Sequence, residues 1–265
     1  MIQVFKRHIY LLLIISILLN LTGGFLVVRK LYYKRLHTKL KEEREKYLNY
    51  TYQRSSVLKW DSIPSDKVIL RSAILNTLVD KFNYNSYLEI GQGYADNNLN
   101  RIKCKIKIGV DPDSNCKATY RLTSDEFFAQ NKATFDLIYV DGLHRKDQVY
   151  KDIINSLKCL NENGTIVVHD CNPINEKMQS EQITDDEWTG DVWKAWVKLR
   201  SERDDLEMFV VPVETGCGII RAGKQKTIKM PDRLTYQYLS ENRKYLLNMI
   251  SVNDFLSYVK ITVAQ

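Results

Sequence analysis

The segment Tyr87-Leu88-Glu89-Ile90-Gly91-Gln92-Gly93 predicts a short buried strand that runs into a glycine turn. Because glycine has no Cβ, such a turn lets backbone N–H groups approach a ligand closely. About 20 residues later, Gly109-Val110-Asp111-Pro112-Asp113 ends the next predicted strand with a carboxylate, which can accept hydrogen bonds from both hydroxyls of a ribose. The pair predicts a nucleoside site. The alternative is a tight turn and an aspartate that caps a loop.

Short apolar runs continue beyond this segment and alternate with stretches whose apolar residues recur at helical spacing. This alternation is typical of a doubly wound α/β domain with a mainly parallel sheet. The tight link Glu214-Thr215-Gly216 separates the last two runs, so we expect them to pair as an antiparallel hairpin. The predicted strands are residues 86–90, 107–110, 135–140, 165–168, 206–213 and 218–221, and the predicted helices include 68–82 and 148–160, with a helix stop at Asn161-Glu162-Asn163-Gly164.

The N-terminal region holds an apolar run without a charged residue, from Ile9 to Val28. A helix of about 20 apolar residues is long enough to cross the hydrocarbon core of a bilayer. The run continues directly into Arg29 and Lys30 without the small-residue pattern of a cleavage site, which favours a retained transmembrane helix. Basic residues are more numerous after the run than before it, so we expect a single-pass membrane protein with its larger part on the cytoplasmic side.

Composition limits the classes of function. The 265 residues permit one α/β domain with appendages. The formal net charge is +7, but much of the basic excess lies beside the N-terminal apolar run, where a membrane surface explains it more simply than nucleic acid does. The five cysteines are scattered and form no C-x-x-C pair, so we expect reduced thiols with neither a disulfide scaffold nor a zinc site.

Six segments together make the region from Tyr87 to about Ala222 resemble the class I S-adenosylmethionine-dependent methyltransferases, in particular the branch that methylates small molecules and sugars on oxygen. The resemblance implies a Rossmann-like, doubly wound sheet of seven strands that ends in an antiparallel hairpin. The segments are Glu89-Ile90-Gly91-Gln92-Gly93, Val110-Asp111-Pro112, Thr123 to Phe128, Asp136 to His144, Val167 to Asp170 and Gly190 to Lys194.

The resemblance also implies the cofactor, S-adenosyl-L-methionine, and how it is held. Electrostatics independently favours this cofactor over a dinucleotide, because the third glycine of a pyrophosphate-binding turn is missing and Asp96 would face the anion. A positively charged sulfonium tolerates nearby carboxylates. By resemblance, Glu89, Gly91 and Gly93 lie beside the methionine part, Asp111 binds the ribose, and Ser124 and Asp125 lie beside the adenine.

Polar side chains follow two neighbouring predicted strands, and the carboxyl ends of parallel strands converge on one crevice. We expect Asp141, His144 and Asp170 to form the acceptor site there. His144 is the leading candidate for a general base, because imidazole accepts a proton near neutral pH, and the alternative is a loop histidine that caps a turn. Asp141, Asp170 and Asn172 form an oxygen set that would hold Mg²⁺, as in metal-dependent relatives. Alternatively, the two carboxylates bind loop backbone or orient the histidines.

Three tryptophans, Trp188, Trp193 and Trp196, precede the last two predicted strands. Helical spacing puts Trp193 and Trp196 on one face, for which core packing is the ordinary explanation. The long polar connection at 173–189 is where a lid or an acceptor pocket would lie, and a tryptophan there would stack on a sugar ring.

Five regions follow from these features: a tail at 1–8, a transmembrane helix at 9–28, a charged juxtamembrane helix at 29–60, the methyltransferase domain at 61–225 and a helical extension at 226–265. The leading hypothesis is methyl transfer to a hydroxyl of a glycan or another membrane-proximal small molecule, with no nucleic-acid partner. One alternative is a catalytically silent, methyltransferase-like module that binds a partner at the membrane. Another is an NAD-dependent oxidoreductase, although its glycine fingerprint is incomplete.

Overall fold

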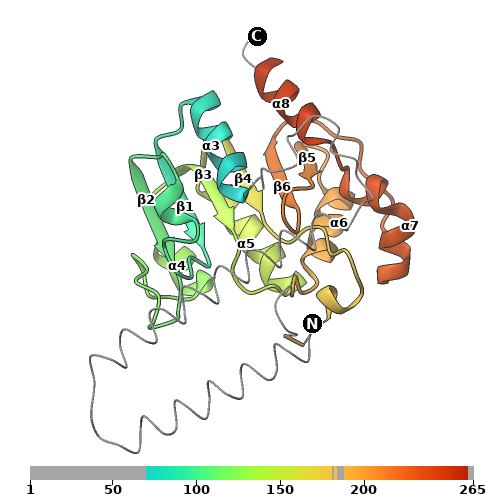
Figure 1. Ribbon diagram of the computed structural model, residues 1–265, viewed down its shortest axis with the longest axis horizontal. Coiled ribbons are helices and arrows are strands. Elements are labelled where there is room, and N and C mark those ends of the chain that lie inside the picture. The colour runs from blue at the N-terminus through green and yellow to red at the C-terminus, as the bar shows by residue number, and fades with distance from the viewer. Residues whose placement is uncertain (1–69, 181, 184–187, 262–265) are drawn as a thin grey trace, which may run out of the picture. The chain divides into compact units, whose positions relative to one another are not determined.

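The structure, a computed structural model, describes residues 70–180, 182–183 and 188–261 (Figure 1). The predicted tail, transmembrane helix and juxtamembrane helix at residues 1–60 lie outside this part of the chain. Within the described residues, no helix has the length and apolar character needed to cross a membrane. The expected anchor and its cytoplasmic orientation therefore stay predictions.

A six-stranded sheet forms the centre of the domain, with the strand order β2-β1-β3-β4-β6-β5. The strands from β2 to β4 are parallel, and β6 is antiparallel to both of its neighbours, β4 and β5. This arrangement confirms the predicted mainly parallel sheet and its closing hairpin. The strands are β1 (Ser86–Ile90), β2 (Ile106–Val110), β3 (Phe135–Val140), β4 (Leu160–Val168), β5 (Leu206–Val211) and β6 (Cys217–Ala222).

Helices cover the sheet on both faces. All residues of β1 are buried, as are all residues of β3 except Asp136, and successive strand residues face opposite sides of a sheet. Helices α4 to α7 lie side by side in chain order, whereas α3 neighbours α8 (Figure 1). The helices are α3 (Arg71–Phe82), α4 (Ser124–Gln130), α5 (Lys146–Lys158), α6 (Val192–Glu202), α7 (Tyr236–Leu247) and α8 (Val252–Ile261), with 3₁₀ turns η1 (Leu99–Arg101) and η2 (Lys177–Gln179) in the loops after β1 and β4.

The expected seventh strand is not found in the part of the chain that the structure describes. Beyond β2, Tyr120 forms one isolated parallel bridge with Val110. Tyr120 donates to the carbonyl oxygen of Gly109 at 3.0 Å and accepts from the N–H of Asp111 at 3.1 Å. The segment after Pro112 is polar and charged and has no apolar run to bury, so the pairing stops at a single bridge.

Strand β4 begins at Leu160, earlier than the predicted Thr165. Leu160 pairs with Phe135 and Thr165 pairs with Leu137, so the intervening residues bulge out of the register. Asn163 adopts a φ of 63°, a left-handed conformation that asparagine tolerates better than most residues. The stretch from Asn161 to Gly164, which we predicted as a helix stop, is therefore a bulge inside a strand, and α5 already ends at Lys158.

The two C-terminal helices belong to the core of the domain. Leu239 and Leu246 of α7 and Phe255 of α8 are fully buried. Arg200 of α6 donates from Nη1 to the carbonyl oxygens of Tyr245 at 2.5 Å and Leu246 at 2.9 Å. The helical extension predicted at 226–265 therefore contains two helices, α7 and α8, and both dock on the domain itself.

Candidate active site

The glycine turn and Asp111 are in direct contact at the carboxyl ends of β1 and β2. The backbone N–H of Gly93 donates to Oδ2 of Asp111 at 2.8 Å. Gly91 and Gly93 adopt φ values of 81° and 54°, which glycine tolerates without strain. A Cβ at Gly91 would lie 2.1 Å from the carbonyl oxygen of Asp141, so the turn also touches the loop after β3. The two features on which the predicted nucleoside site depends are therefore adjacent.

Glu89 is buried at the end of β1, directly before this turn. Its Oε2 accepts hydrogen bonds from the Tyr87 hydroxyl at 2.8 Å and from Asn98 Nδ2 at 3.3 Å. Burial raises the pKa of Glu89 to about 7, although the hydrogen bonds from Tyr87 and Asn98 favour the charged form. A cation next to Glu89 would favour the carboxylate and lower its pKa again.

Among the residues that the structure describes, two buried acceptor atoms near the turn have no hydrogen-bond donor: Oε1 of Gln92 and Oδ1 of Asn98. Gln92 lies over Gly109 of β2, where a Cβ would come within 1.7 Å of Oε1. Asn98 is held beside Glu89 through its Nδ2. An unsatisfied buried acceptor is costly, so these atoms mark a place where a ligand with donor groups and positive charge fits.

Ser124 and Asp125, predicted beside the adenine, begin α4 and lie against α5. Gln148 of α5 donates from Nε2 to Ser124 Oγ at 3.0 Å and to Asp125 Oδ1 at 3.1 Å. Lys151 of α5 pairs with Asp125 Oδ2 at 2.6 Å. These contacts join α4 to α5, and the adenine-binding role of both residues stays a prediction.

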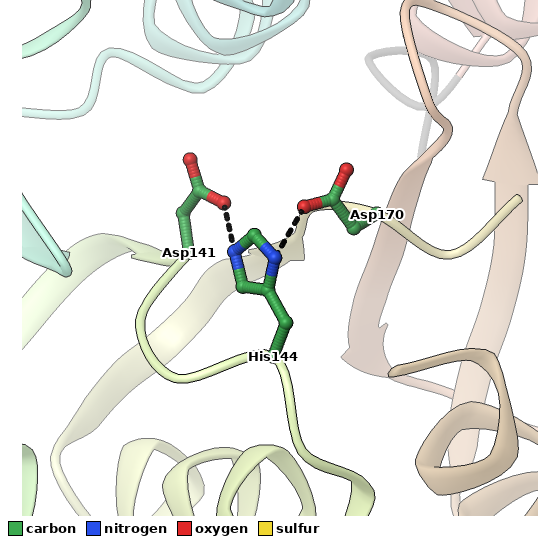
Figure 2. Close-up of side chains that lie close together, drawn as sticks. All are labelled: Asp141, His144 and Asp170. Carbon is green, nitrogen blue, oxygen red and sulfur yellow. Dashed lines mark ion pairs between the residues drawn. The ribbon is translucent and has the colours of Figure 1, made fainter. Parts of the chain in front are cut away.

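His144 lies between two carboxylates (Figure 2). Its Nε2 is 3.3 Å from Oδ1 of Asp141, and its Nδ1 is 3.1 Å from Oδ2 of Asp170. Asp141 follows β3 directly and Asp170 comes shortly after β4, where it adopts a left-handed φ of 61°. Because β3 and β4 are parallel neighbours, their carboxyl ends bring the three predicted catalytic residues together.

The two carboxylates change the protonation of His144. Although burial favours neutral imidazole, the hydrogen bond with Asp141 and the charges of Asp170 and Asp141 raise the pKa of His144 to about 9. Burial also opposes ionisation of Asp141, but the His169 charge and hydrogen bonds from both histidines hold its pKa well below the usual range. At neutral pH this arrangement therefore favours an imidazolium, whereas a general base must be neutral.

Trp188, in the long loop after β4, packs against the ring of His144. The two rings are stacked, with centroids 5.2 Å apart and an interplanar angle of 21°. The indole Nε1 of Trp188 donates to the carbonyl oxygen of Ser180 at 2.6 Å, which fixes the ring. Trp193 and Trp196 are fully buried, which confirms core packing as the explanation for those two.

A second imidazole, His169, extends the cluster toward residues that the sequence did not single out. Its Nδ1 is 3.2 Å from Oδ1 of Asp141, and its Nε2 is 3.2 Å from Oε2 of Glu214. Glu214 in turn accepts from the backbone N–H and from Nη1 of Arg71, each at 3.0 Å. His169, Glu214 and Arg71 therefore form a chain of charges that ends at Asp141.

The signal for Glu214 in the sequence is its place in the turn of the closing hairpin. The link between β5 and β6 lies beside the carboxyl end of β4, since Val168 pairs with Gly218. Polar residues in this link therefore reach the residues after β4, and the hydroxyl of Thr215 donates to Asp170 Oδ1. An acid in this turn is a candidate site residue, but the identity of its partners depends on the folded structure.

Of the predicted metal ligands Asp141, Asp170 and Asn172, the two aspartates lie close together, and His144 lies with them. Asp141, His144 and Asp170 each offer one ligand atom, and these atoms lie within 4.8 Å of one another. Two carboxylates and an imidazole suit a divalent cation once the imidazole has lost its proton. Asn172 Oδ1 accepts from Nη1 of Arg243 at 2.5 Å, so Asn172 would have to release Arg243 to bind a metal through this oxygen. Its role as a ligand stays a prediction.

Residues 76–171 match a family model described as a methyltransferase domain. This part of the chain is a methyltransferase domain. It contains the glycine turn, Asp111, His144 and Asp170, so the resemblance of the sequence to the class I S-adenosylmethionine-dependent methyltransferases is confirmed for the region that carries the site. A comparison with curated proteins returned no match.

Several solved structures are similar to this chain. SAH-bound methyltransferase PaMTH1 from Podospora anserina is 15 % identical with a TM-score of 0.46, and the match covers 76 % of this chain and 100 % of that one. An O-methyltransferase from Bacillus cereus in complex with SAH is 12 % identical with a TM-score of 0.43, over 69 % of this chain and 90 % of that one. TomG from Streptomyces achromogenes, an O-methyltransferase in complex with SAM, is 14 % identical with a TM-score of 0.43, and the match covers 65 % of this chain and 94 % of that one. The identification depends on the domain match and not on these structures.

Proposed function

We propose that the methyltransferase domain transfers a methyl group from S-adenosyl-L-methionine to a hydroxyl of a small-molecule acceptor. The observation that carries the proposal is the 2.8 Å hydrogen bond from Gly93 N–H to Asp111, because it joins the glycine turn to a carboxylate suited to a ribose. The unpartnered acceptors of Gln92 and Asn98 lie in the same loop and suit the donor groups and positive charge of this cofactor.

When bound, S-adenosyl-L-methionine supplies a methyl group activated by its positively charged sulfur. The chain has to hold the acceptor oxygen in line with that methyl group, exclude water and receive the acceptor's proton. In this proposal Asp141 and Asp170 would accept a hydrogen bond from the acceptor hydroxyl, and Trp188, whose ring stacks on that of His144, would shield one face of the imidazole. His144 takes the proton in the fraction of molecules in which its imidazole is neutral.

The acceptor in this proposal is a glycan or another small molecule close to a membrane. The apolar run from Ile9 to Val28 would anchor the chain as a single-pass membrane protein with the catalytic domain on the cytoplasmic side. The indole of Trp188, beside His144, offers a flat surface on which a sugar ring would stack.

A divalent cation, with Mg²⁺ as the expected ion, would be held by Asp141 and Asp170 and would lower the pKa of the acceptor hydroxyl. A thermal-shift assay tests this part separately. We expect Mg²⁺ to raise the melting temperature of the wild-type chain and to leave that of Asp170→Asn unchanged. An equal response of both proteins would argue against this site.

A catalytically silent binding module is the second candidate function. The observation that favours it is the position of His144, which both carboxylates hold as an imidazolium beneath Trp188. Such a module would still bind the cofactor, but it would transfer no methyl group.

A transfer assay distinguishes the two candidates. The full chain is incubated with tritium-labelled S-adenosyl-L-methionine and a membrane lipid and glycan extract, and labelled products are separated. We expect the wild-type chain to transfer label to the extract, and His144→Ala to transfer about 100-fold less. Arg203→Gln is the control and should transfer as much label as wild type, because the ion pair of Arg203 with Asp205 is exposed. Cofactor binding without any transfer would instead support the silent module.

A further inference from the structure

Arg71 stands at the start of α3 and contacts a residue 143 positions away in the chain, in the turn between β5 and β6. We propose that Arg71 is a positioning residue of the acceptor site: through Glu214, it holds the imidazole of His169 against Asp141 and Asp170. The proposal depends on the proposed function only in treating this cluster as the acceptor site.

The first link fixes the carboxylate of Glu214 at both oxygens. The backbone N–H of Arg71 donates to Oε1, and Nη1 of Arg71 donates to Oε2, each at 3.0 Å. Glu214 itself adopts a left-handed φ of 51°, a conformation that is strained in a residue with a side chain. A turn residue in this conformation, bound at two oxygens, has little freedom to move.

The second link fixes the ring of His169 at both nitrogens. Nε2 lies 3.2 Å from Glu214 Oε2, while Nδ1 lies 3.2 Å from Asp141 Oδ1 and 3.3 Å from Asp170 Oδ1. Rotation of the ring would break contacts on both sides at once. The position of Glu214 therefore determines the orientation of the His169 ring. The ring in turn contacts the carboxylates of Asp141 and Asp170.

Arg71 and Glu214 form an ion pair that is largely buried. Within the described part of the chain, Nε of Arg71 is buried and has no hydrogen-bond partner, although a guanidinium has five donors to satisfy. The side chains of Arg71 and Glu214 are 24 % and 21 % exposed, so both charges are removed from most of the solvent and depend on one another. Substitution of Arg71 would leave Glu214 as a half-buried charge beside His169, free to take another position.

Imidazole N–H signals in nuclear magnetic resonance spectra test this link without needing an acceptor. The full chain has four histidines, so selective ¹⁵N labelling gives a simple spectrum. The test variant is Arg71→Met, which keeps the apolar stem, and the rescue variant is Arg71→Lys, which restores the charge. The matched control is Arg221→Ala: Arg221 is also buried, but it donates to Asn163 O at 3.0 Å at the opposite end of the sheet.

We expect a protected ring N–H signal of His169 in the wild-type chain and in Arg221→Ala, its loss in Arg71→Met, and its partial return in Arg71→Lys. Methyl transfer to the membrane extract should fall about 10-fold or more in Arg71→Met, while the affinity for S-adenosylhomocysteine stays unchanged.

The proposal is overturned if Arg71→Met keeps the wild-type His169 signal. This result is distinct from failure of the proposed function, in which the wild-type chain transfers no methyl group but still shows the signal. Should Arg71→Met fail to fold, Glu214→Gln tests the same link, because the neutral amide loses both charge-assisted bonds. An unchanged His169 signal in Glu214→Gln would equally overturn the proposal.

Discussion

At the scale of single residues, Glu89 is held in an environment that favours its neutral form. Burial raises its pKa to about 7, and its side chain is only 2 % exposed, so solvent screens the effect little. Because the folded pKa lies above the unfolded value, the contribution of Glu89 to stability is complete below pH of about 4.5 and is lost as the pH rises to about 7. A bound cation would offset this loss.

The substitution Glu89→Gln should remove the part of the pH dependence of stability that comes from ionisation of Glu89. Relative to wild type, we expect the free energy of unfolding of the variant to rise by about 3 kcal/mol between pH 4.5 and pH 7.5, because the amide does not ionise. Chemical denaturation at several pH values measures this, with the exposed Glu162→Gln as control. A difference that stays constant with pH would contradict the assignment.

The chemical types of the site residues were predictable from the sequence, but their charge states were not. Asp141, His144 and Asp170 were expected at neighbouring strand ends, and they meet there. The pKa of His144 is raised because a carboxylate lies close to each ring nitrogen. These distances are a property of the folded structure and cannot be read from a sequence motif. Arg71 and Glu214 escaped notice for the same reason, since their partners come from distant parts of the chain.

At the scale of elements, the loop after β1 depends on two glycines for different reasons. Gly91 has both a left-handed φ and no room for a side chain, because a Cβ would lie 2.1 Å from the carbonyl oxygen of Asp141. Gly93 has a left-handed φ, but apart from its chain neighbours no described residue comes within 4 Å of the place where a Cβ would lie. Gly91 is therefore required for the close contact between the loops after β1 and β3. Gly93 is required only for the backbone conformation of the loop after β1.

Alanine at these two positions should have unequal effects. We expect Gly91→Ala to lower the free energy of unfolding by about 3 kcal/mol or more and to abolish cofactor binding, because the loops after β1 and β3 must separate. Gly93→Ala should cost about 1 kcal/mol, from backbone strain alone. Denaturant titration and cofactor binding of both variants give the comparison, and equal losses would contradict the role assigned to Gly91.

The mainly parallel sheet and its closing hairpin followed from apolar runs and link lengths, whereas two local features did not. The bulge in β4 depends on partners such as Asp136, which accepts from Asn161 Nδ2 at 2.7 Å. The edge beyond β2 is a single bridge at Tyr120, in a segment that is mostly polar and charged and has no apolar run. Both features depend on contacts with neighbouring strands of the sheet. A sequence pattern reports only on residues that are close along the chain, so it does not predict them.

At the largest scale, that of the described part of the chain, the C-terminal helices share one hydrophobic core with the sheet. Leu246 of α7 is fully buried, and Asn248 Nδ2 donates to the carbonyl oxygen of Met208 in β5 at 2.8 Å. Met249 forms a bridge with Val210. The boundary that we predicted at residue 225 therefore divides a single hydrophobic core.

Leu246→Ala should destabilise the entire domain. The expected loss in the free energy of unfolding is about 2 to 5 kcal/mol, with one cooperative transition, because the cavity lies in the shared core. Leu256→Ala on α8 is the control, since that side chain is 39 % exposed and should cost little. A separate early transition in the Leu246→Ala protein would show that the C-terminal helices unfold by themselves.

In the function that we propose, the glycine turn and Asp111 together bind the adenosine of S-adenosyl-L-methionine. Calorimetric titration of the full chain with S-adenosylhomocysteine tests it most directly, with Asp111→Ala as the test variant and Asp113→Ala as its exposed neighbour and control. We predict binding by the wild-type chain and by Asp113→Ala, and affinity about 10-fold or more weaker for Asp111→Ala. No binding by the wild-type chain, or equal affinities in all three proteins, would contradict the account.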